Sequence, residues 1–418
     1  MVEFIMRDRA GSRHVLSYDP ARHCLSYEGS PLVLPGREAG VAPDKPAPVG
    51  RYGRLAVRLV LGKNCNFRCA YCCQHLAGKR HEPDPNDLEG LVDRILRVAG
   101  ESGLSNIQFW GGEPFLYFDT LKKLHKLFQE RNTAPHAPGF FVPTNGLLLH
   151  GERLDWVLEN GIAVMVSWDG PGQHLRGKDV LAEGRTLDAV RRIYARQPDK
   201  ISIAPILSRH SAAHRAVVDM VREKLGTDHF NLGEGRLISV VDEQSMAAAI
   251  PREDLPDFSR RMHADLVSGE LPQFSMAHEV ASSWIYTLNR ESLAPRPCMC
   301  HVGRDDTLIV DLEGNVLTCS TFECGDVDES GEAHKLCHIS QMNSMADRPS
   351  PQLRRLTRRQ EDRCANCAML HACRGGCPYA PEAYADYNCA ASYAWSLPMV
   401  GLALHMITGD ILEEVRSV

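Results

Sequence analysis

Four cysteines lie within the segment KNCNFRCAYCC, residues 63–73. Three of them, Cys65, Cys69 and Cys72, have the spacing C-x3-C-x2-C, which lets one short loop offer three thiolates to a cubane iron–sulfur cluster. The fourth iron of such a cluster has no protein ligand. An open iron can chelate a substrate or cofactor while the cluster delivers an electron. The pattern therefore predicts redox chemistry at an open iron.

A zinc site or a group of buried thiols is the alternative interpretation of this loop. Structural zinc sites typically use paired C-x2-C knuckles closed by four ligands. This loop has an x3 spacing, and His75 or Cys73 would have to complete the zinc set. The spacing favours iron and sulfide, with Cys73 as a bystander.

Composition narrows the class of protein. The chain has 418 residues, a formal net charge of -6 and fifteen cysteines. An odd number of cysteines leaves a disulfide scheme incomplete, and a reducing compartment leaves thiols for metals. The charge balance predicts no nucleic-acid partner and no binding to an anionic membrane. The N-terminus carries charges where a signal peptide needs an apolar run, and no segment reads as a spanning helix of ~20 residues. We expect a cytoplasmic protein.

Strand-like and helix-like patterns alternate between residues 51 and 235. Residues 55–62 and 106–110 read as buried strands, and residues 87–100 have apolar side chains at helical spacing. Six such repeats predict parallel strands with right-handed crossovers. Periodicity leaves an open sheet and a full or partial barrel as alternatives, but both bind ligands at the carboxyl ends of their strands. The cysteine loop follows the first strand and therefore lies at that face.

The loop resembles the radical SAM superfamily signature C-x3-C-x-aromatic-C, matched by Cys65, Cys69, Tyr71 and Cys72. A second family motif, GGEP, follows the second predicted strand. The resemblance implies that its backbone and carboxylate hold the methionyl ammonium of S-adenosyl-L-methionine (SAM), since glycines allow close approach and a carboxylate pairs with an ammonium. The residues of this motif are Gly111, Gly112, Glu113 and Pro114.

Two further strand ends are candidates for the same pocket. The segment VSWDGP places Ser167 and Asp169 after the fourth strand, where family members contact the ribose of SAM. Turn chemistry alone is the alternative role for Asp169. Residues 144–146, TNG, end the third strand and are a further candidate for lining the pocket.

Ten cysteines lie between Cys298 and Cys389, and seven of them have the order and spacing of a SPASM domain, which many radical SAM enzymes carry. This resemblance implies two auxiliary clusters. The nearer one would take Cys300, Cys319 and Cys377, with Cys298 as the natural fourth ligand and Cys324, Cys337 or an open iron as alternatives. The distal one would take Cys364, Cys367, Cys373 and Cys389. The alternative is that both clusters only stabilise a loop-rich fold.

The resemblance implies an α/β fold, with a partial (β/α)6 barrel followed by a loop-rich iron–sulfur domain. We expect a β-rich preface and linker at 1–50, the barrel and connecting helices at 51–295, the SPASM domain at 296–395 and a closing helix at 396–418. The implied cofactors are SAM and three [4Fe–4S] clusters, one that binds SAM and two auxiliary.

The implied chemistry is hydrogen abstraction by a 5′-deoxyadenosyl radical, followed by oxidation through the auxiliary clusters. Sulfatase-maturing members have an aspartate where this chain has Ser320, which disfavours formylglycine formation. Our leading hypothesis is maturation of a ribosomally made precursor peptide by a carbon–carbon, ether or thioether crosslink. The alternatives are a small-molecule radical SAM dehydrogenase and an iron–sulfur protein with a structural or electron-relay role only.

We also expect partners and leave one role unassigned. Flavodoxin or ferredoxin would donate electrons. Since the preface shows strands and no helix-turn-helix pattern, either a separate protein binds the leader or the substrate is recognised through the barrel and its helices. The acid–base residue for the substrate is unknown. Glu234, Arg236 and His210 lie near late strand ends, where an ordinary surface or core role is the simpler expectation.

Overall fold

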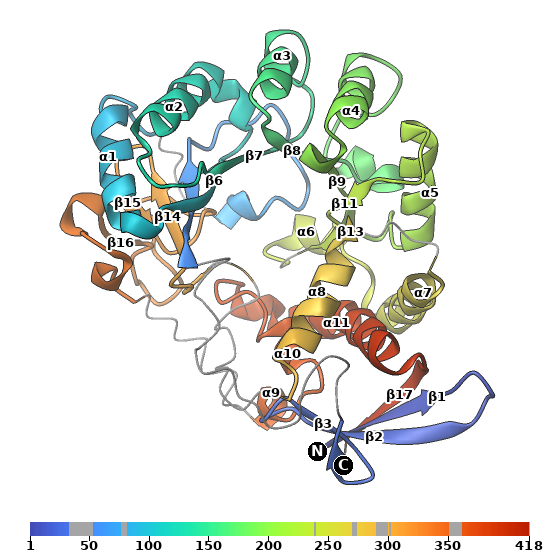
Figure 1. Cartoon of the computed structure of the whole chain (residues 1–418). Coiled ribbons are helices and arrows are strands. Elements are labelled where there is room, and N and C mark those ends of the chain that lie inside the picture. Colours follow the sequence, from blue (N-terminus) through green and yellow to red (C-terminus); the bar gives the residue numbers. More distant parts are fainter. Residues whose placement is uncertain are drawn as a thin grey trace.

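A parallel sheet curves through the upper part of the molecule (Figure 1). The computed structural model describes residues 1–32, 53–76, 82–237, 240–269, 274–289, 300, 302–350 and 362–417. The sheet follows chain order from β5 outward, so consecutive strands are neighbours, as βα repeats require. Its parallel strands are β5 (Leu55–Val60), β6 (Leu104–Trp110), β7 (Gly139–Thr144), β8 (Ala163–Ser167), β9 (Ile201–Ala204), β11 (Asn231–Leu232) and β13 (Phe274–Ser275). A short parallel pair, β10 (Ile206–Leu207) and β12 (Gly235–Arg236), forms a separate two-stranded sheet. The expected α/β fold is confirmed.

Helices cover the outer face of this sheet (Figure 1). They are α1 (Leu88–Ala99), α2 (Phe118–Arg131), α3 (Glu152–Glu159), α4 (Arg185–Arg196) and α5 (His214–Leu225). Helix α1 shows why they form where the sequence predicts. Its apolar side chains at helical spacing are all buried, and the Asp87 carboxylate caps its start by accepting from Gly90 N.

Alternate residues of each strand point to opposite faces, which separates the core from the barrel interior. Val57, Leu59 and Phe109 are fully buried against the helices. Arg58 and Gln108 alternate with these residues along their strands and are only partly buried. The interior face therefore carries polar side chains that can meet a ligand.

The cysteine-rich region continues the barrel sheet. Strand β14 (Thr307–Asp311) pairs in parallel with β5, and β15 (Asn315–Leu317) and β16 (Lys335–His338) follow as antiparallel neighbours. Residues some 250 positions apart along the chain, such as Ala56 and Thr307, thus become partners. This pairing brings the segment around Cys319 next to the strand that leads into the first cysteine loop.

A second sheet joins the two ends of the chain, at the bottom of Figure 1. The N-terminal preface contains the strands β1 (Val2–Arg7), β2 (Arg13–Asp19), β3 (Cys24–Tyr27) and β4 (Ser30–Pro31), and β17 (Ile411–Ser417) pairs with β1. The prediction of a helix up to residue 418 is wrong for this last segment. Gly409 has a φ of +79°, its N–H donates to the carbonyl of His405, and this left-handed cap ends the helix.

The remaining helices form a second core between this sheet and the barrel. They are α6 (Glu243–Ala248), α7 (Leu255–Val267), α8 (Met276–Thr287), α9 (Asp362–Ala365), α10 (Leu370–Cys373) and α11 (Ala385–Thr408). Helix α11 is long and apolar enough to cross a membrane by length and composition alone, contrary to the expectation that no segment is. Trp395 and Met399 on it are buried, and Trp395 stacks on Phe258 of α7. A core helix meets the same criterion.

Candidate active site

The cysteine loop is held by the backbone of the GGEP motif. Gly112 N donates to the carbonyl of Gly62 at 3.0 Å, and Glu113 N donates to the carbonyl of Asn64 at 2.8 Å. A Cβ on Gly112 would lie 2.2 Å from the Asn64 carbonyl oxygen, and one on Gly111 would lie 2.4 Å from that of Gly62. Both glycines are therefore required by the close approach of the two segments. The sequence interpretation placed these motifs at neighbouring strand ends, and the structure brings them into contact.

The three cysteines of the motif lie close together on this loop. Burial raises the pKa of Cys69 and of Cys72, and the nearby thiol of Cys65 raises both further. Cys72 N donates to the carbonyl of Cys69 at 3.2 Å, and Cys65 Sγ accepts from Phe67 N at 3.4 Å. Three soft ligands on one wrapped loop suit a [4Fe–4S] cluster, because thiolate is the ligand that such clusters use.

Glu113 ties the ends of two strands together. Its carboxylate is 1% exposed and accepts from Thr144 Oγ1 at 2.8 Å, from Asn145 N at 2.8 Å and from Phe115 N at 3.1 Å. Burial raises its pKa to about 7, against the lowering effect of these hydrogen bonds. The Asn145 amide in turn donates to Asn66 Oδ1 at 2.6 Å. The TNG segment thus lies against the cysteine loop, and the SAM contacts of the GGEP residues remain a prediction.

Asp169 lies behind the cysteine loop, completely buried. Its carboxylate accepts from the Tyr71 hydroxyl and from Ile206 N at 2.8 Å, and it pairs with Arg176 Nε at 2.9 Å. The carboxylate therefore joins the aromatic residue of the signature to the segment after β8. Ser167 ends β8 on the partly exposed interior face. Contact of Ser167 and Asp169 with the ribose remains a prediction, and the partners of Asp169 add a structural role that the motif did not reveal.

The cysteines of the predicted distal set lie in one neighbourhood. Cys367, on the loop between α9 and α10, has its pKa raised to about 11 by burial and by the thiols of Cys373, Cys389 and Cys364, which are the members of the predicted distal set. His371 lies between them in sequence and stacks on His23 of the N-terminal sheet, with ring centroids 3.8 Å apart. The distal set therefore packs against the preface.

The predicted nearer set is spread along the barrel side. Cys300 and Cys319 both lie near the Arg58 guanidinium, whereas Cys377 lies near Arg236 together with Cys373 of the distal set. Cys298 lies outside the described residues. The sequence interpretation missed Arg58 and Lys63, which contact the segment after Cys319; the only signal was a charge within the apolar run LAVRLVLG.

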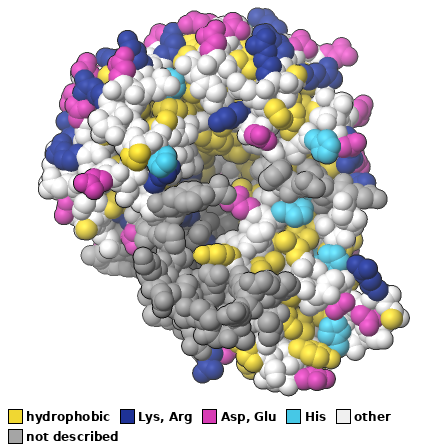
Figure 2. Space-filling view, in the orientation of Figure 1, with side chains coloured by type: hydrophobic (Ala, Val, Ile, Leu, Met, Phe, Trp, Pro, Cys, Tyr) yellow, Lys and Arg dark blue, Asp and Glu magenta, His cyan; other side chains and the backbone are white. Residues whose placement is uncertain are grey.

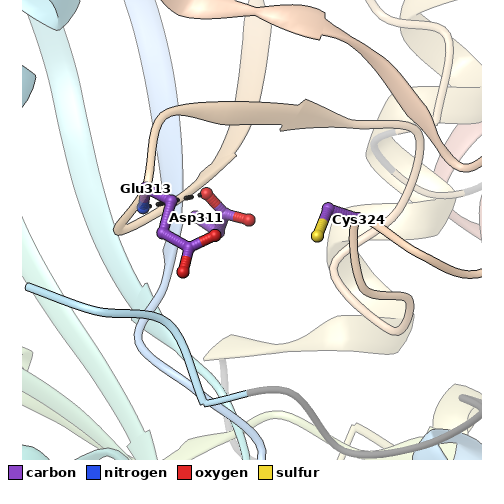
Figure 3. A group of neighbouring side chains, drawn as sticks. All are labelled: Asp311, Glu313 and Cys324. Atoms are coloured by element: carbon purple, nitrogen blue, oxygen red, sulfur yellow. Dashed lines mark hydrogen bonds between the residues drawn. The ribbon is translucent and has the colours of Figure 1, made fainter.

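Cys324 has carboxylate neighbours. Figure 3 shows its thiol facing Asp311 and Glu313, and their ligand atoms lie within 4.8 Å of one another. Asp311 is already used by the turn between β14 and β15, where it accepts from Glu313 N at 3.0 Å and from Asn315 N at 2.8 Å. Burial is the main cause of the raised pKa of Cys324, and the two carboxylates raise it further. Whether Cys324, Cys337 or Cys298 completes the nearer set remains a prediction.

Two of the three polar residues near late strand ends have structural partners. The Glu234 carboxylate, 1% exposed, accepts from Met276 N and Ala277 N, both at 3.1 Å, at the start of α8. Arg236 is buried and donates to the carbonyl of Leu237 at 3.3 Å. His210 lies near the surface with its ring 4.5 Å from that of His174. An acid–base role for Glu234 is not needed to explain its position.

Glu234 makes stability depend on pH. Burial raises its pKa from 4.5 to about 7, so between these values the folded protein holds a proton that the unfolded chain has released. The free energy of unfolding therefore falls as pH rises through this window. Glu234→Gln lacks the titration. From pH 5 to 7.5 we expect the wild type to lose about 1–3 kcal/mol relative to the variant in anaerobic urea denaturation. A difference that stays constant with pH would contradict this role of burial.

Residues 59–206 match the radical SAM superfamily. The chain therefore carries a radical SAM domain, which spans the cysteine loop, the GGEP motif and β8, and the expected enzyme class is confirmed for this domain. Such a domain implies SAM and one [4Fe–4S] cluster, and the thiol set described above fits that cluster. The number of auxiliary clusters remains a prediction.

Curated relatives include GTP 3′,8-cyclase of Clostridium perfringens (strain SM101), 33% identical over 150 residues, a match that covers 34% of this chain and 42% of that protein. GTP 3′,8-cyclase of Parasynechococcus marenigrum is 34% identical over 27% of this chain and 33% of the relative. The chain thus spans less than half the length of these relatives, and their activity does not transfer with the match.

Two solved structures share the fold over a longer range. The enzyme anSMEcpe with bound AdoMet has a TM-score of 0.62 and 18% identity, over 84% of this chain and 99% of that one. Streptococcus suis SuiB bound to S-adenosylmethionine has a TM-score of 0.51 and 15% identity, over 78% of this chain and 73% of SuiB. At these identities the likeness is one of fold. The structural likeness covers more of the chain than the match to the radical SAM family does.

Proposed function

We propose that the protein is a radical SAM maturase that installs an oxidative crosslink in a ribosomally made peptide. The observation that carries the proposal is the extent of the fold match, since 84% of the chain follows 99% of anSMEcpe, a protein also solved with bound AdoMet and a peptide. The protein in that complex is 19% identical to this chain, so its bound peptide supports only an inference about the class of substrate.

The proposed SAM site lies within the radical SAM domain. Cys65, Cys69 and Cys72 would hold the cluster, and the GGEP residues with Ser167 and Asp169 would hold SAM. When bound, these groups would supply a radical able to abstract hydrogen from an unactivated carbon. The chain's own contribution is positioning: Glu113 N donates to the carbonyl of Asn64 and the Asp169 carboxylate accepts from the Tyr71 hydroxyl, and both contacts fix the loop. Figure 2 shows a hollow in this face with hydrophobic side chains in its wall, which would exclude water from a bound substrate.

The position of Ser320 favours a crosslink over formylglycine. Its hydroxyl accepts from Arg58 Nη1 at 3.2 Å and its carbonyl accepts from Lys63 Nζ at 2.5 Å. A serine in this arrangement is a poor base, whereas the resemblance places an aspartate here in sulfatase-maturing enzymes. The two-electron oxidation would then end in bond formation within the peptide.

The experiment uses anaerobically reconstituted protein, SAM, dithionite and peptides encoded beside the gene. We expect 5′-deoxyadenosine together with a peptide that is lighter by two hydrogens, and no such product from the Cys65/Cys69/Cys72 triple alanine variant. Deuterium on the peptide should appear in 5′-deoxyadenosine. GTP is run in parallel, because the curated relatives are GTP cyclases over part of the chain. Turnover of GTP with unchanged peptides would overturn the proposal.

A further inference from the structure

A buried lysine and a partly buried arginine converge on one residue at the junction of the barrel and the cysteine-rich region. Arg58 Nη1 donates to Ser320 Oγ at 3.2 Å, and Lys63 Nζ donates to Ser320 O at 2.5 Å. Arg58 lies in β5, Lys63 lies just before the first cysteine of the signature, and Ser320 directly follows Cys319. Cys73 Sγ contacts Thr321 Oγ1 at 3.6 Å, which adds a third contact between the same segments. The two cysteine regions are thus joined by this short stretch.

The hydrogen bonds of Arg58 go to neutral groups. Nε and Nη2 donate to Gln108 Oε1 at 3.1 and 3.0 Å, and the guanidinium lies 4.2 Å from the centroid of the Trp110 ring. Lys63 is 2% exposed. Within the described ranges, neither cation is in an ion pair of 4.0 Å or less with a carboxylate. A buried cation is expensive unless an anion neutralises it, so the arrangement requires negative charge nearby.

Thiols come first among the groups that can provide this charge. The thiols that act electrostatically on the Arg58 guanidinium are Cys319, Cys300 and Cys73, in that order. For Lys63 the corresponding groups are Cys319 and Cys73, followed by Glu323 and Asp326. Cys319 comes first for both cations. Cys300 and Cys319 are also the two members of the predicted nearer set that share a neighbourhood.

We propose that Arg58 and Lys63 neutralise the iron–sulfur cluster held by Cys300 and Cys319 and raise its reduction potential. This inference rests on the auxiliary clusters of the proposed function. A cluster bound by thiolates is negatively charged, and nearby charge is one of the factors that set its potential. Positive charge in a low-dielectric setting favours the reduced, more negative form. The nearer cluster would thereby become the better electron acceptor, as an oxidative reaction requires.

The test is a redox titration followed by electron paramagnetic resonance. The background is the Cys65/Cys69/Cys72 triple alanine variant, so that only auxiliary clusters contribute. In it, Arg58→Gln should move the midpoint potential of one of two signals to a more negative value, and Arg58→Lys should retain most of the original potential. Arg131→Gln is the matched control, because Arg131 lies on α2 and pairs at the surface with Asp93 and Glu89. It should change neither signal.

The outcomes distinguish a charge role of Arg58 from a role in shape or in substrate binding. Loss of iron in Arg58→Gln that is rescued in Arg58→Lys supports a charge role, whereas loss in both variants assigns Arg58 to shape and overturns it. Potentials that do not change in iron-loaded Arg58→Gln also overturn it, and a raised KM for peptide in that variant would assign the guanidinium to the substrate. A triple alanine background without iron and sulfide would refute the auxiliary clusters themselves, and the charge role with them.

Discussion

Cys69→Ala should reduce 5′-deoxyadenosine formation to background, while Cys364→Ala should retain SAM cleavage and lose most of the modified product. The reason is a division of labour between the two cysteine regions. Cys69 lies on the loop that GGEP holds, inside the radical SAM domain. Cys364 lies with Cys367 in the neighbourhood that packs against the N-terminal sheet. Loss of a distal ligand therefore leaves the SAM site intact.

Matched measurements make this result interpretable. Iron and sulfide are determined in each variant, and circular dichroism checks that the protein is folded. Cys24→Ala, in β3, is the control for removal of a cysteine outside the predicted ligand sets. Equal loss of cleavage in the Cys69 and Cys364 variants, with both proteins folded, would contradict the division of labour.

The sequence predicts the parts of this site that depend on local chain. Three cysteines on one loop, and a GGEP turn after the next strand, need only strand order to come together, and hydrophobic periodicity supplies that order. Helix α1 likewise follows from its apolar spacing and from Asp87 as its cap. The confirmed fold and domain class follow from these local signals.

Long-range pairing explains what the sequence did not reveal. The register of β14 on β5 joins positions such as Val57 and Leu308, and periodicity carries no information on partners that distant. The roles of Arg58 and Lys63 depend on this register, because it places Ser320 beside them. The same limit applies to β17, whose residues 411–417 read as a continuation of a helix until β1 is known to be their partner.

Asp169→Asn should lower the free energy of unfolding by about 3–5 kcal/mol, because the change leaves the Arg176 guanidinium buried without its counter-charge. The Arg176 side chain is 11% exposed and Asp169 is fully buried. An asparagine can still accept from Ile206 N, but it removes the negative charge shared with Arg176 and the acceptor of the Tyr71 hydroxyl. Since Ala70 N donates to the carbonyl of Leu175 at 2.7 Å, loosening this segment should also loosen the cysteine loop.

The measurement is urea denaturation under anaerobic conditions, with iron content and SAM affinity determined on the same samples. Asp93→Asn is the matched control, because Asp93 is exposed and pairs at 2.6 Å with Arg131, which is partly exposed. Surface pairs of this kind contribute about 0–1 kcal/mol, so the control should unfold almost as the wild type does. A variant at Asp169 that unfolds normally but binds SAM weakly would refute the structural role, and would assign this carboxylate to the ribose as the family resemblance implies.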